Sequence, residues 1–148
     1  MVRKMKISTK GRYGLRAMID LAINSGEECC ASLADISERQ DLSLNYLESI
    51  FSYLKRAGLV VGIAGAQGGY MLAKPADKIT LYEIMTVLEG NMSVYDNFGR
   101  KTKIRSFLNR NVWDVIDENV NEVLTGTTLA DVMKNIETSR LSGDCSAL

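Results

Sequence analysis

The chain has 148 residues, enough for one domain with its own core and an appended element but short for two independent domains. With 46% hydrophobic residues, 24% charged residues and a formal net charge of zero, it has the composition of an ordinary folded protein. No apolar run approaches the ~20 residues of a membrane span and no signal-peptide core follows Met1, so we expect a cytoplasmic protein with no membrane partner.

The residue types argue against catalysis. Histidine is absent, which removes the commonest general base and the commonest metal ligand. Cys29, Cys30 and Cys145 have neither the spacing of a metal knuckle nor the number of a disulfide framework, so a reduced compartment is the simpler interpretation. We expect no enzymatic activity, no metal and no cofactor. Cys29 and Cys30 are predicted to be structural thiols, with a redox switch as the alternative.

Charge is distributed unevenly along the chain. Residues 1–16 contain cations and no acid, whereas the segment after Asn111 is mainly acidic. The cations are Arg3, Lys4, Lys6, Lys10, Arg12 and Arg16. Because DNA affinity depends largely on phosphate neutralisation, the basic N-terminal segment indicates where a nucleic acid would bind.

Capping residues and apolar spacing predict three helices in the first half of the chain. Ser8 or Thr9 begins the first, and a capping box from Ser32 to Asp35 begins the second. Ser43 caps a third, longer helix. Its predicted buried stripe is Leu44, Leu47, Ile50, Phe51 and Leu54. Its predicted outer face is Asn45, Tyr46, Glu48, Ser49, Ser52, Lys55 and Arg56.

A glycine-rich β-hairpin is predicted directly after the third helix. Residues 59–64 and 70–73 have the pattern of strands, and residues 65–69 that of the turn between them. The turn is not a phosphate-binding nucleotide loop, because a strand follows it where such a loop requires a helix. Two consecutive helices followed by a hairpin is the element order of a winged helix-turn-helix, which we expect to occupy residues 1–90.

The rest of the chain is predicted to be mainly helical. A capping box from Thr80 to Glu83 opens a helix that ends at Gly90, and residues 91–103 form a linker or loop. Residues 104–138 hold a dimerisation helix of about six turns and a short terminal helix, and residues 139–148 a flexible tail. A long helix with a wide apolar stripe needs a partner surface, so we predict a homodimer. The dimerisation residues are Ile104, Phe107, Leu108, Val112, Val115, Ile116, Val120 and Val123.

The outer face of the third helix is interpreted as a DNA-reading surface. A solvated polar face has the same pattern, but the basic segment before it and the hairpin after it favour DNA. Asn45 can pair with an adenine edge, Glu48 can accept from cytosine, and Tyr46 can reach a phosphate or a thymine methyl. Lys10, Arg12, Lys55 and Arg56 are candidate phosphate contacts.

Several segments together resemble the Rrf-type family of bacterial winged-helix transcriptional regulators. They are Met5–Leu15, Ser32–Ser37, Leu44–Glu48, Arg56–Val60 and Gly68–Tyr70. The resemblance implies a dimeric repressor or dual regulator on a pseudo-palindromic operator in double-stranded DNA, with the third helix in the major groove and the wing in the minor groove. By position it assigns DNA contacts to Lys10, Arg12, Ser43, Asn45, Tyr46, Glu48 and the wing at Gln67 and Gly68.

Two departures from the family pattern affect function. Ala64 stands where relatives often have arginine before the first wing glycine, so minor-groove contact is expected to be reduced or the operator to differ. Residues 91–103 contain none of the three cysteines of iron–sulfur members, which excludes a cluster of that type. The family's cysteine-metabolism repressors, which respond through a partner enzyme of cysteine synthesis, are similar in lacking it. A thiol-based redox sensor and a winged helix used for protein contacts remain alternatives.

Overall fold

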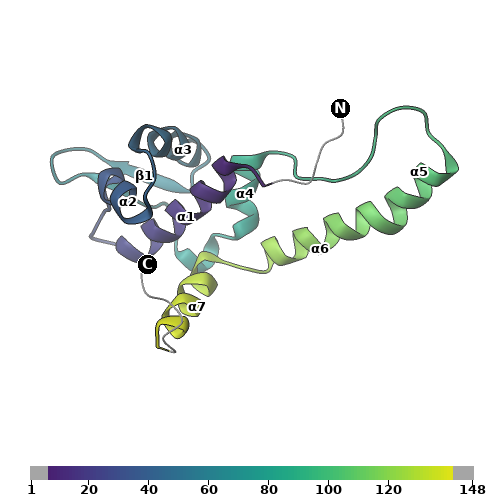
Figure 1. Cartoon of the computed structure of the whole chain (residues 1–148). Coiled ribbons are helices and arrows are strands. Elements are labelled where there is room, and N and C mark those ends of the chain that lie inside the picture. Colours follow the sequence, from purple (N-terminus) through teal and green to yellow (C-terminus); the bar gives the residue numbers. More distant parts are fainter. Residues whose placement is uncertain (1–6, 142–148) are drawn as a thin grey trace.

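The computed structural model describes residues 7–141 as one winged-helix body with a projecting arm (Figure 1). The first elements are α1 (Thr9–Asn24), α2 (Leu33–Gln40), α3 (Leu44–Arg56), β1 (Val60–Ile63), β2 (Gly69–Leu72), the 3₁₀ turn η1 (Ala76–Lys78) and α4 (Leu81–Glu89). The later elements are α5 (Lys103–Leu108), the π-helical η2 (Asn109–Trp113), α6 (Asp114–Thr125) and α7 (Leu129–Leu141). This confirms the predicted fold class, mainly helical with one hairpin.

Helices α1 to α4 bury one apolar core. Their inward side chains, including Met18, Ile36, Leu47, Phe51 and Ile84, are 0% exposed. These positions recur at helical spacing, so each helix places its apolar face inward and its polar face in water.

Local capping explains where the helices begin, with two corrections. Ser8, Ser32, Ser43 and Thr80 each cap their helix by accepting a hydrogen bond from a first-turn backbone amide. Thr80 and Glu83 form the predicted capping box. The return bond predicted for the box at Ser32 is not among the hydrogen bonds of the described residues.

Both differences concern exposed side chains. Asp35 is exposed, and its charge adds to the larger effect of Asp20 in raising the pKa of Arg39. The predicted burial of Leu44 is wrong, because this first residue of α3 is 41% exposed, ahead of the turns that face the core.

The hairpin is fixed to the segment before α2. Strands β1 and β2 are antiparallel, with Val60 opposite Leu72 and Ile63 opposite Gly69. The amide and carbonyl of Ala31 exchange hydrogen bonds of 2.9 and 2.8 Å with Tyr70, which adds a third backbone segment to the sheet. The wing therefore has a set position relative to α2 and α3.

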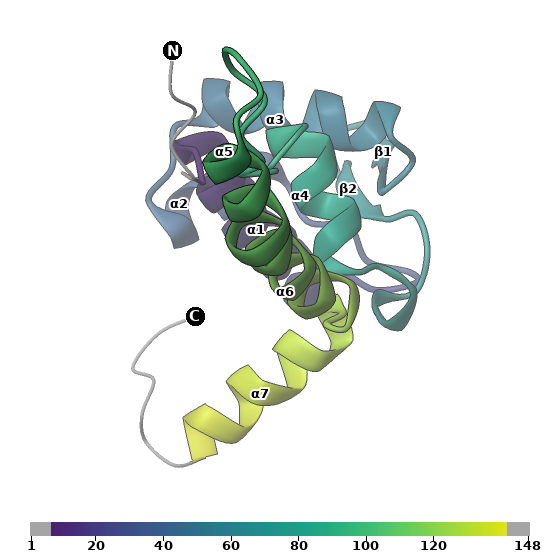
Figure 2. The ribbon, with the colours of Figure 1, turned by 90° about the vertical axis from the view of Figure 1, so that its right-hand side faces the viewer.

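The arm consists of residues 91–125. In Figures 1 and 2 the loop 91–102 runs outward beside the helix, and α5, η2 and α6 return as one continuous helical run. This run matches the predicted long helix, except that residues 109–113 adopt a π-helical turn. Side chains of the helix hold the loop: Asn109 bonds to the amide and carbonyl of Asp96 at 3.0 and 2.8 Å, and Arg105 donates to the carbonyls of Asp96 and Gly99 at 3.1 and 2.6 Å.

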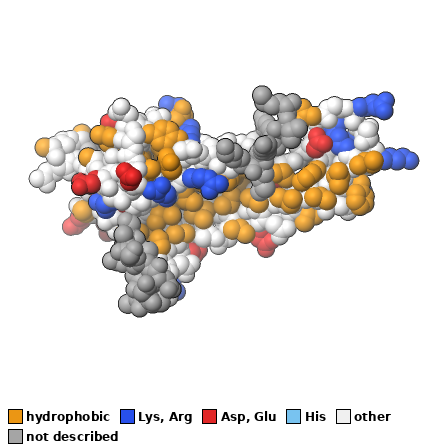
Figure 3. All heavy atoms as spheres, in the orientation of Figure 1, with side chains coloured by type: hydrophobic (Ala, Val, Ile, Leu, Met, Phe, Trp, Pro, Cys, Tyr) orange, Lys and Arg blue, Asp and Glu red, His pale blue; other side chains and the backbone are white. Residues whose placement is uncertain are grey.

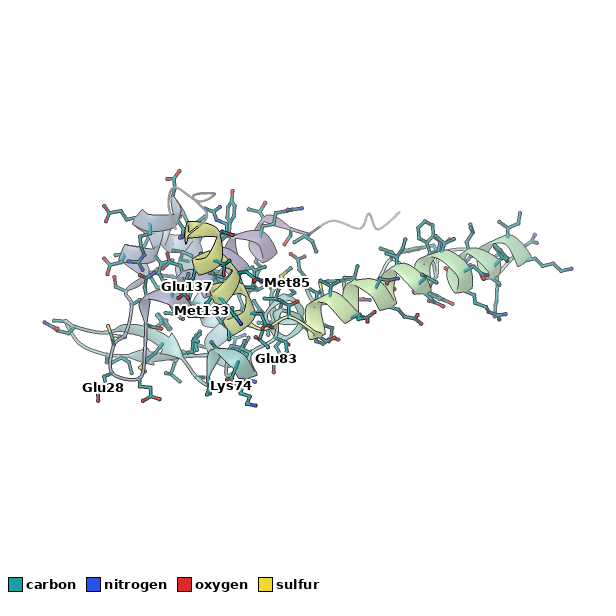
Figure 4. All side chains as sticks on the ribbon, turned by 90° about the horizontal axis from the view of Figure 1, so that it is seen from below. Glu28, Lys74, Glu83, Met85, Met133 and Glu137 are labelled. Atoms are coloured by element: carbon teal, nitrogen blue, oxygen red, sulfur yellow. The ribbon has the colours of Figure 1, made fainter. Side chains whose placement is uncertain are left out.

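Helix α7 turns back onto the winged-helix body, where it packs against α1 and η1. Leu129 is 0% exposed and its amide donates to the carbonyl of Ile79 at 2.9 Å. Met133, labelled in Figure 4, also packs on the core. Residues 139–141 of the predicted tail belong to α7, and the rest of that tail lies outside the described residues. Within residues 7–141, no helix is long and apolar enough to cross a membrane.

Candidate nucleic-acid interface

Helix α3 presents a polar face to solvent. Leu47, Ile50, Phe51 and Leu54 turn inward. The residues predicted to read DNA lie on the other side, where all are exposed except the half-buried Tyr46. They are Ser43, Asn45, Tyr46, Glu48, Ser49, Ser52, Lys55 and Arg56. Tyr46 packs edge-to-face on Tyr13 of α1, with ring centroids 6.1 Å apart, so α1 supports this face from behind.

The start of α1 brings cations to the end of α3. The Lys10 ammonium lies 3.5 Å from the ring centroid of Tyr53, and the Arg56 guanidinium 5.7 Å from the same centroid. Arg12 is exposed and donates to the Ile7 carbonyl at 3.1 Å. Of the predicted basic segment, Arg3, Lys4 and Lys6 lie outside the described residues.

Glu89 of α4 fixes the position of this helix start. Its carboxylate accepts hydrogen bonds from the Ser8 amide at 2.9 Å and from the Ser8 hydroxyl at 2.5 Å. A Cβ at Gly11 would lie 2.0 Å from the same carboxylate, so a larger residue there would displace the Glu89 side chain from this position. The backbone that carries Lys10 and Arg12 is therefore held in place by α4.

The wing lies beside the other flank of α3. A Cβ built at Gly62 of β1 would be 3.5 Å from the Lys55 ammonium of α3. Gln67 is exposed at the tip, and the Gly68 amide donates to the Gly65 carbonyl at 3.0 Å. A Cβ at Gly68 would lie 2.1 Å from the Ile63 carbonyl oxygen, so this residue shapes the turn and has no side chain to offer a ligand.

An ion pair with a buried carboxylate links α1 and α2. The side chain of Asp20 is 1% exposed and lies 2.7 Å from Nη2 of Arg39. Gln40 donates to the same carboxylate at 2.7 Å, and Asn24 at 3.3 Å. The hydrogen bond with Asp20 raises the pKa of Arg39. Because α2 leads directly into α3, this network helps to position the polar face.

Sequence reasoning did not name Tyr53 as part of this surface, and it included Arg16 only as a member of the basic segment 1–16. Tyr53 is 41% exposed, and its ring contacts the two cations named above. Arg16 donates to the Gln40 carbonyl, and its guanidinium lies 5.4 Å from the ring centroid of Tyr13. A signal existed for Tyr53, since it follows Tyr46 by two helical turns and so shares its side of α3. The basic segment already indicates Arg16 as a cation near DNA, whereas its bond to Gln40, 24 residues away, has no local signal.

The arm carries the predicted dimerisation residues on an exposed apolar face (Figure 3). Ile104 is 75% exposed, Phe107 63% and Val123 64%, which is unusual for such side chains. Leu108 and Val115 are also exposed, and the remaining members are half-buried: Val112, Ile116 and Val120. The structure thus places all eight residues along one helical run.

Comparison with known proteins gives consistent matches over most of the chain. The profile of the Rrf2 family, described as an iron-dependent transcriptional regulator, matches residues 7–135. The HTH-type transcriptional regulator CymR of Bacillus subtilis is 45% identical over 128 residues, covering 86% of this chain and 89% of CymR. The HTH-type transcriptional regulator IscR of Cereibacter sphaeroides is 42% identical over 139 residues, 88% of each chain.

Solved structures agree with these relatives. The structure of CymR, the global cysteine regulator of B. subtilis, has a TM-score of 0.77 at 44% identity and covers 88% of this chain and 97% of that one. The structure of T. potens IscR has a TM-score of 0.75 at 41% identity and covers 90% of both chains.

The family description raises the question of an iron site, which the residues present do not fit. Residues 91–103 contain no cysteine or histidine, and thiolates are the usual ligands of an iron–sulfur cluster. Among residues 7–141, no three histidine, cysteine, aspartate or glutamate side chains are grouped to hold a metal. Asp96 and Asp117 accept hydrogen bonds from the loop itself. On sequence and structure alike, the chain belongs to the Rrf2 family and is a DNA-binding transcription regulator with a winged helix-turn-helix fold.

Proposed function

We propose that the protein is a cluster-free, sequence-specific repressor that binds a pseudo-palindromic operator as a homodimer. The observation that carries this is the arrangement around α3, where Lys10 of α1 lies on Tyr53 and Lys55 lies against the wing strand. A polar helix face with cations at its flanks suits a major groove and the phosphates beside it.

Individual roles follow from side-chain chemistry. Asn45 has the donor and acceptor to pair with an adenine edge, and Glu48 can accept from cytosine N4. The hydroxyls of Ser43, Ser49, Ser52 and Tyr46, and the cations of Lys10, Arg12, Lys55 and Arg56, serve as phosphate or base-edge contacts. Gln67 at the wing tip is assigned to the minor groove, with Gly68 shaping the turn that carries it.

The exposed apolar face of the arm supports the homodimer. The helical run also has an uneven charge distribution: Lys103, Arg105 and Arg110 lie in its first half, and Asp114, Glu118 and Glu122 in its second. Two copies packed antiparallel would bring each basic half against an acidic half. A second copy therefore satisfies both the hydrophobic and the electrostatic requirements of this surface.

The experiment that tests the proposal is selection of bound sequences from a pool of random duplexes, repeated at two salt concentrations. We expect a two-fold symmetric motif and an affinity that falls steeply as salt rises. If no motif is enriched, the DNA-reading role assigned to α3 is wrong, and the winged helix serves protein contacts.

Two variants separate base reading from phosphate contact. Asn45→Ala is expected to cost about 1–3 kcal/mol at one base position and to relax specificity there. Lys10→Ala is expected to weaken all sequences equally and to lower the salt slope by about one. If Lys10→Ala instead lost specificity at one base position and Asn45→Ala weakened all sequences equally, the two roles would have to be exchanged.

The remaining parts of the proposal concern the location of the protein, its lack of enzymatic activity and a partner protein. We infer a cytoplasmic regulator without enzymatic activity, supported by its regulator relatives and by the absence of histidine from the chain. The likeness to a cysteine regulator supports the predicted partner enzyme of cysteine metabolism. Co-purification of such an enzyme with the tagged protein tests this part.

A thiol-based sensor is the second candidate, because one contact favours it. The thiol of Cys30 lies 3.2 Å from the carbonyl oxygen of Gln67 and so joins the segment before α2 to the wing tip. Oxidation or alkylation of Cys30 would remove that donor. Operator affinity of the wild type and of Cys29→Ser should then fall on oxidation, while Cys30→Ser stays unresponsive; equal behaviour of all three excludes sensing at Cys30. Cys145 lies outside the described residues.

A further inference from the structure

A small polar cavity lies where α4, the start of the loop 91–102 and α6 meet. Its volume is about 180 Å³. That is well above the roughly 10–15 Å³ that holds one water and below the roughly 300 Å³ at which drug-sized pockets begin. The polar side chains that line it are Tyr82, Thr86, Asn91, Ser93, Asp117 and Asn121. The cavity therefore has room for a small organic molecule with several hydrogen-bonding groups.

Asp117 gives the cavity its charge. It is the one charged residue among those lining the cavity. Its carboxylate accepts from the Ser93 hydroxyl and, at 2.9 Å, from the Val94 amide. Within the part of the chain that the structure describes, no lysine or arginine forms an ion pair with it. A carboxylate can accept about four hydrogen bonds, so acceptor capacity remains toward the cavity.

This lining selects the chemical class of the ligand. An ammonium group has three donors and a positive charge, which match the carboxylate together with hydroxyl and amide oxygens. An anion would meet the Asp117 carboxylate with no cation beside it. A divalent metal takes six or more oxygen ligands, usually from several carboxylates, and this lining has one. We propose that the cavity is an effector site for a small compound with a primary ammonium group.

The position of Asp117 connects such a site to the rest of the molecule. The carboxylate belongs to α6, whereas Ser93 and Val94 belong to the loop that leads from the winged helix into the arm. A ligand bound to this carboxylate and to Ser93 adds a further link between loop and helix. Ordering the loop in this way before DNA binds would raise operator affinity; that consequence rests on the proposed function, whereas ligand binding itself does not.

Three small probes of similar size test the site on the full chain without DNA. They are ethanolammonium, neutral ethylene glycol and anionic glycolate, titrated at constant ionic strength and followed by NMR shifts of the amides of residues 90–94 and 117–121. We expect saturable binding of ethanolammonium and none of the other two. Asp117→Asn should weaken binding at least about ten-fold, while Asp114→Asn, which removes a neighbouring charge outside the lining, should leave it unchanged. Asn121→Ala, an exposed lining residue, provides a second variant if Asp117→Asn does not fold.

Several results would overturn the proposal. These are no saturable binding of ethanolammonium, equal binding of glycolate, or unchanged binding in both lining variants. The effector role is measured separately: operator affinity of the wild type should rise roughly five-fold or more with saturating ethanolammonium, and that of Asp117→Asn should not. If the operator affinity of the wild type does not change with ethanolammonium, the effector role is rejected. If the protein binds no operator with or without ethanolammonium, the proposed DNA function is rejected, while the NMR titration still decides whether the cavity binds the ammonium compound.

Discussion

Asp20 is a buried charge that holds two helices of the DNA-binding domain together. Its carboxylate accepts from Arg39, Gln40 and Asn24, and loss of such an acceptor leaves donors unsatisfied in a low-dielectric position. We expect Asp20→Ala to lower the free energy of unfolding by about 2–3 kcal/mol. Urea denaturation measures this. Glu28→Ala, which truncates an exposed carboxylate between α1 and α2, is the control and should change stability by less than about 0.5 kcal/mol.

The Lys74–Glu83 pair gives the protein a pH-dependent contribution to stability. The two side chains, labelled in Figure 4, meet at 2.8 Å between the end of the wing and α4. The hydrogen bond from Lys74, and then that from the Thr80 amide, hold the pKa of Glu83 below its ordinary value of 4.5. A lowered folded-state pKa means that the stabilisation is complete above 4.5 and is lost as pH falls through the folded-state value.

Glu83→Gln should therefore make the stability curve less steep below about pH 5. Urea unfolding at a series of pH values is the measurement. The control is Glu38→Gln on the exposed surface of α2, for which we expect the wild-type slope. A wild-type slope in Glu83→Gln as well would show that the pair does not contribute to acid sensitivity.

At the scale of elements, the arm contains the feature least accessible to sequence reasoning. Apolar spacing predicted one uninterrupted helix from Ile104 to Leu124, whereas residues 109–113 form a π-helical turn. Asn109 at the start of that turn is 6% exposed and holds the backbone of Asp96. A π-turn shifts the side chains that follow it, and such turns are frequent at functional sites. Spacing alone carries no signal for a partner thirteen residues away in an irregular loop.

Asn109→Ala is expected to release the loop 91–102 from the helix. Amide hydrogen exchange in the loop should accelerate by roughly ten-fold or more, because two hydrogen bonds of a buried side chain are lost. Asn111→Ala is the matched control, since Asn111 bonds only the Phe107 carbonyl of its own helix among the described contacts. Equal exchange rates in both variants would mean that Arg105 and Asp117 suffice to hold the loop.

At the scale of the whole molecule, the arm exposes an apolar face that one chain does not cover. Phe107→Glu places a charge there twice in a symmetric dimer, so we expect the dimer dissociation constant to rise at least about 100-fold. Light scattering after size exclusion measures the mass. Lys78→Glu on η1 also introduces a glutamate, away from the arm, and should remain dimeric. A wild type that is monomeric at micromolar concentration would contradict the proposed assembly.

Local sequence patterns predict the order and type of the elements, most helix starts, the glycine turn of the wing and the apolar face of the arm. These features depend on capping bonds and periodicities between residues a few positions apart. The three-dimensional fold adds that Leu129 joins the core, that Leu44 does not, that Lys10 lies on Tyr53, and that Asp117 lines a cavity. Each of these depends on packing between segments distant in the chain, which no local pattern encodes.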